Sequence, residues 1–234
     1  MMNISLYNQG NPIWRDKLLS PTSLTMGGYG CYISSVAMIL SNFVIFDDPG
    51  RVRDKLVAVK GLNSEGMLTY DGLERAFSGV YFNERVYTEN DPSGNFLKMD
   101  MTTAVDNIKR LIDYGMPPIL CVDNVGYDGI PDHAVVGKDY QDGRNGLVTD
   151  FLINNPDGGR EQWFSERYGD PMKKLYGYVS IIGSPVSFKD DKNSRLGQAV
   201  YKLVQANRGV NTKLNIKEAL SVILKPQISG LDKP

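Results

Sequence analysis

The sequence predicts an α+β fold in which helices come first and hairpin-linked strands follow. Apolar residues recur at three- and four-residue spacing in the first half of the chain, which is typical of helices that bury one face. In the second half, short runs rich in Val, Ile and Tyr are separated by turn residues, as strands are. Because helices and strands are grouped rather than alternating, we expect N-terminal helices packed on an antiparallel β-sheet.

Composition limits the function classes. A length of 234 residues with 41% hydrophobic residues indicates a globular chain that buries a core. The net charge is −1, and nucleic-acid binding requires concentrated basic charge, so we expect no nucleic-acid partner. No apolar run approaches the roughly 20 residues of a membrane-spanning helix, and the N-terminus lacks the pattern of a secretory signal.

The first helices follow from local patterns. Residues 1–25 contain turn residues and little periodicity, and we interpret them as a surface arm. The next helix begins near Cys31, ends near Asn42 and buries Ile33, Val36, Ala37 and Leu40. Another begins at Pro49 with Asp48 as its N-cap and Gly61 as its end, and buries Val52, Leu56 and Val59. A short helix is expected over residues 69–77.

One further helix and several strands complete the predicted core. Thr103 and Asp106 start a helix that ends before Gly115, and its buried stripe is Val105, Ile108, Leu111 and Ile112. Strands are expected at residues 80–87, 119–122, 133–138, 147–153 and 176–182. Residues 142–146 form a hairpin turn between the strand at 133–138 and the strand at 147–153.

The character of the chain changes near residue 184. Residues 189–194 are a polar linker, and two short amphipathic patterns follow it, the first ending at Gly209 and the second at Pro226. We therefore predict a main domain over residues 1–184 and a two-helix C-terminal tail over residues 185–234. The tail is expected to serve as an attachment element, through self-association or a larger assembly, or to pack on the main domain.

Cys31 is the first candidate for chemistry. Three glycines crowd the segment before it, and the helix starts directly after. Unpaired N–H groups at a helix start favour an anion such as a thiolate, and glycines let a substrate backbone approach the sulfur. The alternative is a structural cysteine, since free cysteine is often buried as a small hydrophobic residue. We expect that second role for Cys121, at the end of a predicted strand.

His133 is the single histidine of the chain, so any mechanism that needs an imidazole uses it. It opens one predicted strand, and Asn155 follows the next one. Antiparallel strands joined by a turn bring these two positions together. A cysteine nucleophile needs a base, and the base needs a third group that orients its ring. The alternatives are a structural histidine and a plain turn at residues 154–159.

In this order, these residues resemble the bacteriocin-leader (double-glycine) peptidases, a branch of the papain-like cysteine peptidases. The resemblance spans roughly residues 7–182 and rests on Gln9, on Gly30-Cys31 with Ser34–Met38, on His133–Val136 and on Asn155-Pro156. It implies a papain-like fold, Cys31 as nucleophile, His133 as base and acid, and Asn155 as the residue that orients His133. It also implies that the Gln9 amide helps to form the oxyanion hole.

One position departs from the family pattern. The orienting residue is usually an aspartate in this family, and here it is Asn155. Papain-like enzymes in general use asparagine there, because an amide oxygen accepts the ring N–H. The departure removes a charge that would stabilise the imidazolium, and Asp157 and Asp132 are the alternative candidates for the role.

The resemblance also suggests substrates. Stand-alone relatives are implied in cutting the peptide part of bacterial peptidoglycan, including in bacteriophage lysis or virion proteins, so a virion-associated protein or one released from bacterial cytoplasm is expected. The alternatives are a peptidase of leader peptides and a degenerate domain that binds or builds a larger particle. No cofactor or metal is expected: one His and two distant Cys lack zinc-ligand spacing, and residues 123–129 and 139–142 depart from the EF-hand calcium pattern.

Overall fold

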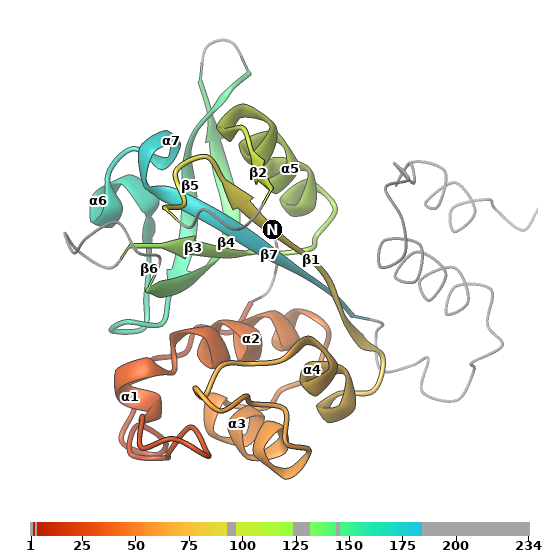
Figure 1. Cartoon of the computed structure of the whole chain (residues 1–234). Helices are drawn as coiled ribbons and strands as arrows, with labels where there is room; N and C mark the ends of the chain where they lie inside the picture. Colours follow the sequence, from red (N-terminus) through yellow and green to blue (C-terminus); the bar gives the residue numbers. More distant parts are fainter. Residues whose placement is uncertain (1, 3, 93–96, 124–131, 144–145, 184–234) are drawn as a thin grey trace, which may run out of the picture. The chain divides into compact units, whose positions relative to one another are not determined.

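A computed structural model of the chain describes residues 2, 4–92, 97–123, 132–143 and 146–183, and it confirms the α+β class (Figure 1). The described helices are α1 (Met26–Tyr29), α2 (Cys31–Asn42), α3 (Pro49–Ala58), α4 (Tyr70–Ala76), α5 (Met101–Asp113), α6 (Phe164–Tyr168) and α7 (Pro171–Lys174). The described strands are β1 (Val80–Thr88), β2 (Lys98–Met99), β3 (Ile119–Val122), β4 (His133–Asp142), β5 (Val148–Asn155), β6 (Arg160–Trp163) and β7 (Leu175–Gly183).

The seven strands form one sheet in the order β2-β1-β7-β3-β4-β5-β6. Five of its six pairings are antiparallel. The expectation of a purely antiparallel sheet is wrong at one edge, because β2 pairs with β1 in parallel. The N–H of Glu89 also donates to the carbonyl of Met99 (3.0 Å), so the chain just after β1 turns back onto this edge segment. The sheet is therefore mixed.

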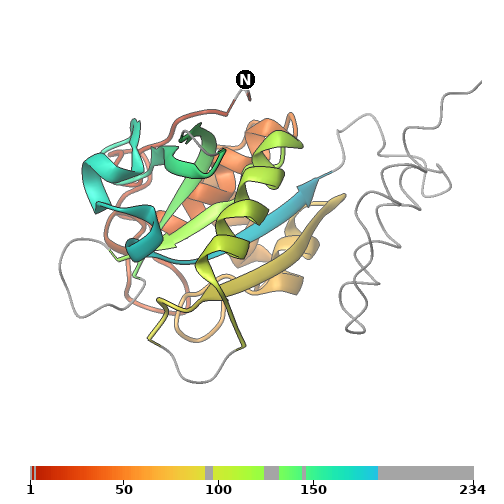
Figure 2. The same cartoon turned by 90° about the horizontal axis from the view of Figure 1, so that it is seen from above.

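Helices cover both faces of the sheet, and each face has its own core (Figures 1 and 2). Successive side chains of a strand point to opposite faces, and β4 shows this clearly. Ala134 and Val136 belong to the core under α2, α3 and α4, whereas Val135 belongs to the core under α5 and α6. Because β4 is buried on both faces, it holds the backbone of its first residue, His133, in a fixed position.

Helix α2 is buried along nearly its whole length, from Ile33 to Ser41. A helix that is apolar on most sides belongs inside a domain, and α2 packs there against β4. The hydroxyl of Ser35 donates to the carbonyl of Ala134 (3.1 Å), which fixes the first turns of α2 against the start of β4. The helix starts at Cys31 and ends at Asn42, as predicted.

Gly30 connects the short helix α1 to α2, and the connection leaves no room for a side chain. A Cβ at Gly30 would lie 2.3 Å from the carbonyl oxygen of Met26 and 2.9 Å from its Cα. The N–H of Gly30 donates to that same carbonyl (2.8 Å) while Gly30 serves as the N-cap of α2. The glycine before Cys31 is thus needed to bring two helices end to end.

The remaining helix predictions mostly hold. Asp48 caps α3, as expected, and the short helix expected over residues 69–77 is α4, which Thr69 caps. Helix α5 begins at Met101 rather than at Thr103, because the carboxylate of Asp100 accepts from the N–H of Thr103 and so is the N-cap. Its predicted stripe is buried, and Gly115 follows with φ = +70°.

Two predictions about the N-terminal half are wrong. Val59 is only partly buried, because α3 ends at Ala58 and Lys60, not Gly61, takes the left-handed conformation with φ = +53°. The segment before α1 is irregular, as expected, but it is not a surface arm throughout. Trp14 and Leu19 are buried in the core under α2, and Ser5 donates its N–H to the hydroxyl of Ser41 (2.8 Å).

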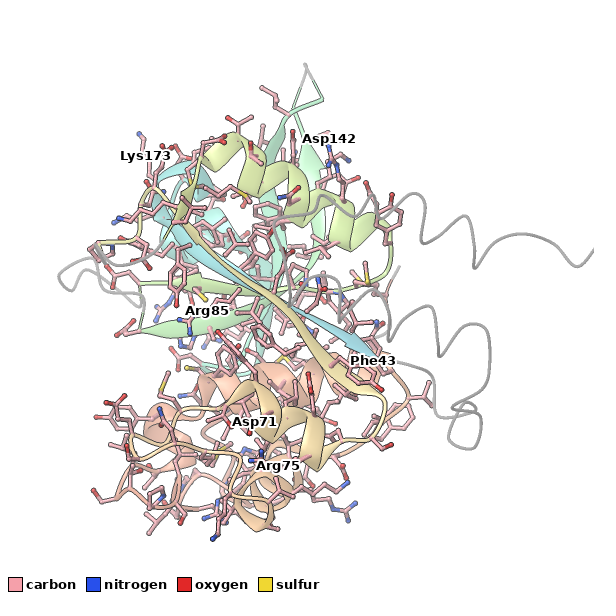
Figure 3. The ribbon with its side chains drawn as sticks, turned by 45° about the vertical axis from the view of Figure 1, so that its right-hand side comes forward. Phe43, Asp71, Arg75, Arg85, Asp142 and Lys173 are labelled. Carbon is pink, nitrogen blue, oxygen red and sulfur yellow. The ribbon has the colours of Figure 1, made fainter. Side chains whose placement is uncertain are left out.

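The predicted strands are all present, and most are longer than expected. Strand β4 continues to Asp142, and β5 reaches Asn155. Strand β6 and helices α6 and α7 were not predicted, because each is five residues or fewer. Figure 3 shows Phe43 beside the end of β7, where a Cβ at Gly183 would lie 2.1 Å from its ring. The predicted tail over residues 185–234 lies outside the described residues.

Candidate active site

The structure joins His133 and Asn155 directly. The imidazole Nε2 of His133 lies 2.9 Å from Oδ1 of Asn155, and both side chains are buried. They meet because β4 and β5 pair in antiparallel fashion, with Val136 opposite Asn154. The sequence predicted that these two residues would be neighbours, and the register of β4 with β5 brings them into contact.

The contacts of Asn155 also fix which ring nitrogen of His133 carries hydrogen. The backbone N–H of Asp157 donates to the same Oδ1 (2.9 Å), and Nδ2 of Asn155 donates to the hydroxyl of Tyr168 (3.0 Å). The atom that faces His133 is therefore the amide oxygen, an acceptor. Nε2 of the neutral ring must donate, which leaves Nδ1 as the basic nitrogen.

Cys31 lies at the first turn of α2, against the segment that contains His133. Its Sγ is 4.0 Å from the carbonyl oxygen of Asp132, and the backbone N–H groups of Ala134 and Tyr32 point to the sulfur. No hydrogen bond joins the Cys31 thiol to the His133 ring among the described residues. Cys31 therefore contacts the backbone of Asp132 and Ala134, the residues on either side of His133, but makes no direct polar contact with the His133 ring.

Burial sets the protonation of both groups. It raises the pKa of the Cys31 thiol to about 11, although the N–H groups of Ala134 and Tyr32 oppose the shift. Burial also lowers the pKa of His133, against the hydrogen bond from Asn155 and the charges of nearby aspartates. The resting pair is thus a neutral thiol and a neutral imidazole. The helix start does not by itself produce the thiolate that the sequence suggested.

Gln9 lies near both of these groups. Its backbone N–H donates to the carbonyl of Pro156 (2.9 Å), one residue after Asn155. Its side-chain Nε2 donates to the carbonyl of Gly27 (3.0 Å), in the glycine-rich segment before Cys31. This bond uses one of the two amide hydrogens and leaves the second, while the buried Oε1 has no hydrogen-bond partner among the described residues.

The alternative orienting residues lie close by but hold other roles. Asp157 pairs its carboxylate with Arg167 (3.3 Å) and contacts Asn155 only through its N–H. Asp132 offers its carbonyl to Cys31. Both carboxylates favour the charged form of His133, with a smaller effect than the hydrogen bond of Asn155. Asn155 is therefore the group in contact with the ring.

Cys121 does not fit the expected role of core filler. It is partly exposed, and the register places it opposite Ala134, the residue whose N–H points to Cys31. Both cysteines are free thiols. Burial raises the pKa of Cys121 to about 11, so it is no better a nucleophile than Cys31 at neutral pH.

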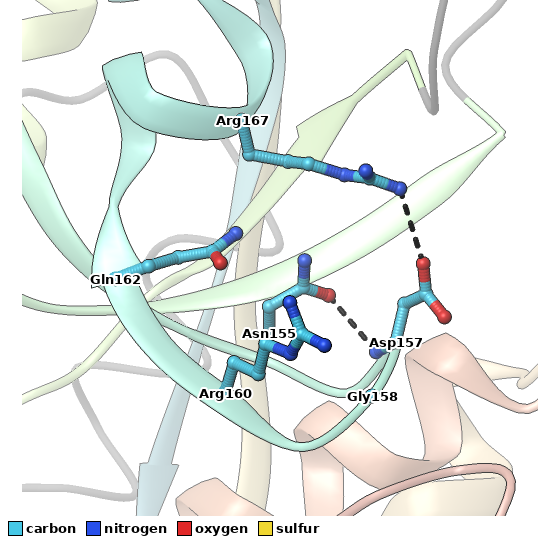
Figure 4. Close-up of a pocket in the computed structure, with 6 residues that line it drawn as sticks. All are labelled: Asn155, Asp157, Gly158, Arg160, Gln162 and Arg167. Carbon is cyan, nitrogen blue, oxygen red and sulfur yellow. Dashed lines mark hydrogen bonds and ion pairs between the residues drawn. The ribbon is translucent and has the colours of Figure 1, made fainter.

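Sequence reasoning missed the residues that support Asn155. Tyr168 comes from α6, and its hydroxyl holds the Asn155 amide while its ring lies 6.4 Å from the His133 ring. Beside Asn155 lies a small pocket lined partly by Arg160, Gln162 and Arg167 (Figure 4). None of these belongs to a motif: the pairing of β5 with β6 brings Arg160 and Gln162 to the site, and α6 brings Arg167 and Tyr168.

The described residues contain no cluster of three or more His, Cys, Asp or Glu side chains that could hold a metal ion. The calcium candidate at residues 123–129 lies mostly outside them. Nor is any helix in the described part of the chain long and apolar enough to span a membrane. Comparison of the chain with protein-family models, curated proteins and solved structures found no match.

Proposed function

We propose that the chain is a papain-like cysteine peptidase in which Cys31 is the nucleophile, His133 the base and acid, and Asn155 the orienting residue. The observation that carries the proposal is the buried hydrogen bond from His133 to Asn155 beside the cysteine that starts α2. A nucleophile, a base and an orienting group from three distant segments are what acyl transfer through a thiol requires.

In the first half of the reaction, the Sγ–H proton of Cys31 moves to Nδ1 of His133 as the sulfur attacks the peptide carbonyl. Because both groups are neutral at rest, this transfer accompanies attack instead of preceding it. The carbonyl oxygen becomes an oxyanion that accepts from the free N–H of Cys31 at the helix start and from the second Nε2–H of Gln9. Asn155 keeps the imidazolium in place through Nε2.

In the second half, His133 gives its proton to the leaving nitrogen, and the C–N bond breaks. The acyl group stays on Sγ as a thioester. Water then loses a proton to Nδ1 of His133 and attacks the thioester, which releases a carboxylic acid and restores the thiol. Each step transfers one proton to or from Nδ1 of His133, so the single imidazole of the chain is sufficient.

For the substrate we propose the peptide part of bacterial peptidoglycan, the class that the resemblance favours. The test incubates the protein with purified peptidoglycan and, separately, with a peptide that carries a double-glycine cleavage site. New amino groups released from peptidoglycan alone, and absent with Cys31→Ala, support the proposal. Cleavage of the double-glycine peptide alone reassigns the protein to leader processing.

A second candidate is a peptidase-like domain that has lost catalysis and serves a binding or structural role. The raised pKa of Cys31 and the missing contact with His133 favour this reading. Alkylation by iodoacetamide separates the candidates. An active Cys31–His133 pair reacts with iodoacetamide at pH 7, and the rate of alkylation falls in the His133→Gln variant. An isolated thiol reacts only as the pH approaches its pKa of about 11.

A further inference from the structure

A pocket of about 170 Å³ lies directly beside Asn155. Its lining comes from the end of β5, the turn after it, β6 and α6, and consists of Asn155, Asp157, Gly158, Arg160, Gln162 and Arg167 (Figure 4). Arg160 pairs with Asn155 in the ladder between β5 and β6. Directly paired residues of an antiparallel ladder point to the same face, so both side chains project to the same side of the sheet.

The pocket is lined mainly by donors, and its net charge is positive. Asp157 is its one carboxylate, and it pairs with Arg167 at 3.3 Å. Arg160 has no ion-pair partner among the described residues. Nε2 of Gln162 is buried and has no hydrogen-bond partner there either. Arg160 is exposed, so its guanidinium is free to bind a ligand, and the buried Nε2 of Gln162 needs an acceptor; a negatively charged acceptor would satisfy both.

The pocket is connected to the imidazole through Asn155, which lines the pocket and bonds His133. Asn155 bonds His133 directly, and the charges of Asp157 and Arg167 both act on the pKa of His133, after burial and the Asn155 hydrogen bond. In the sheet, β5 and β6 lie beyond β4 on the side away from β3. Because His133 must protonate the leaving nitrogen, the part of the substrate that departs lies on this side of Cys31.

We propose that this pocket binds a carboxylate on the leaving part of the substrate, with Arg160 as the residue that selects it. This inference rests on the proposed peptidase function and extends it to the class of peptide cut: one whose leaving part carries a free carboxylate close to the cleaved bond. A planar guanidinium fork matches a carboxylate in two parallel hydrogen bonds. Arg167 also lines the pocket, but its charge is offset by its ion pair with Asp157, so Arg160 supplies the net positive charge (Figure 4).

The test uses pairs of cell-wall stem peptides, L-Ala-γ-D-isoglutaminyl-L-Lys-D-Ala with and without a further D-Ala, each as the free acid and as the C-terminal amide; because the α-carboxyl of the D-glutamyl residue is amidated, the C-terminal carboxylate is the only one. The two members of a pair differ only in the terminal charge. Binding is measured by calorimetry in the Cys31→Ala protein, which keeps the pocket and cuts nothing. Arg160→Gln is then added, and Arg110→Gln is the matched control, since Arg110 is an exposed arginine of α5 outside the pocket lining.

We expect the free acid to bind about tenfold more tightly than the amide, the size of one charge-assisted contact. Arg160→Gln should remove that difference, and Arg110→Gln should keep it. Equal affinity for acid and amide in the Cys31→Ala protein, no binding of either peptide, or discrimination that survives Arg160→Gln overturns the proposal.

The two proposals fail in different ways. Wild-type protein that cuts acid and amide peptides with the same KM refutes the pocket and leaves the peptidase in place. Discrimination in binding that depends on Arg160, with no hydrolysis by the wild type, supports the pocket as a binding site and refutes the peptidase.

Discussion

Replacing Asn155 tests the centre of the proposed mechanism. In the native structure its side chain makes three hydrogen bonds: from Nε2 of His133, from the N–H of Asp157 and to the hydroxyl of Tyr168. Asn155→Ala removes all three at a buried site. At roughly 1 kcal/mol for each bond, the free energy of unfolding should fall by about 3 kcal/mol. Turnover should fall as well, because the His133 ring loses the group that orients it.

Asn155→Asp separates orientation from charge. The carboxylate still accepts from His133 and from the N–H of Asp157, and the Tyr168 hydroxyl can turn to donate to it. The new negative charge favours imidazolium, so the pKa of His133 should rise relative to the wild type. Turnover should then be preserved or higher. Denaturant unfolding gives the stability, and the imidazole NMR signal, from the one histidine of the chain, gives the pKa without an assignment problem.

The stability of the wild type should also depend on pH with a definite sign. Burial holds the pKa of His133 below its ordinary value of 6.5, so the unfolded chain binds a proton more readily than the folded one. This group therefore makes stability rise with pH, and it costs stability as the pH falls below 6.5. Asn155→Asp should reduce that loss. Equal turnover in Asn155→Ala and wild type, with an unchanged titration of His133, would refute the orienting role and move it to Asp157 or Asp132.

Other substitutions address the remaining residues. Cys31→Ala should fold normally and lose hydrolysis by roughly a thousandfold or more, whereas Cys121→Ala should keep it; the reverse pattern would identify Cys121 as the nucleophile. Gln9→Ala should lower turnover roughly a hundred- to a thousandfold, about 2.7–4 kcal/mol, because one oxyanion donor is lost. A change in KM alone would make Gln9 a binding residue. A chain that ends at Ser184 should stay soluble and active but lose self-association or particle binding; aggregation would show instead that the tail belongs to the core.

The fold could be predicted from the sequence where one local signal was strong. Asp48-Pro49 marks a helix start, and the stripe from Val105 to Ile112 marks a buried helix face, so both are where the pattern placed them. Most of the elements that were missed have no such signal, and α7, which does begin with Asp170-Pro171, is too short at four residues to show a periodic stripe. Strand β2 has two residues and is defined only by its pairing with β1.

The same distinction applies to the site. Pairing of His133 with Asn155 followed from hairpin geometry alone, since the start of one strand meets the end of the next. The roles of Tyr168 and Arg160 did not, because they depend on β6 and α6 folding back against β5. The protonation of Cys31 was also beyond sequence reasoning. It depends on how much protein surrounds the sulfur, and burial here outweighs the helix start.

One backbone contact connects the parts of the site that sequence separates most widely. The N–H of Gln9 donates to the carbonyl of Pro156 (2.9 Å), so the residue proposed to hold the oxyanion is tied to the turn that follows the orienting Asn155. That turn contains Gly159 at φ = +61°, where a Cβ would lie 2.8 Å from the Cβ of Asn8. A side chain there would strain the turn and push away the segment that carries Gln9. Gly159, in the turn after Asn155, is therefore required for the geometry of the site, as is Gly30 before Cys31, although neither glycine takes part in the chemistry.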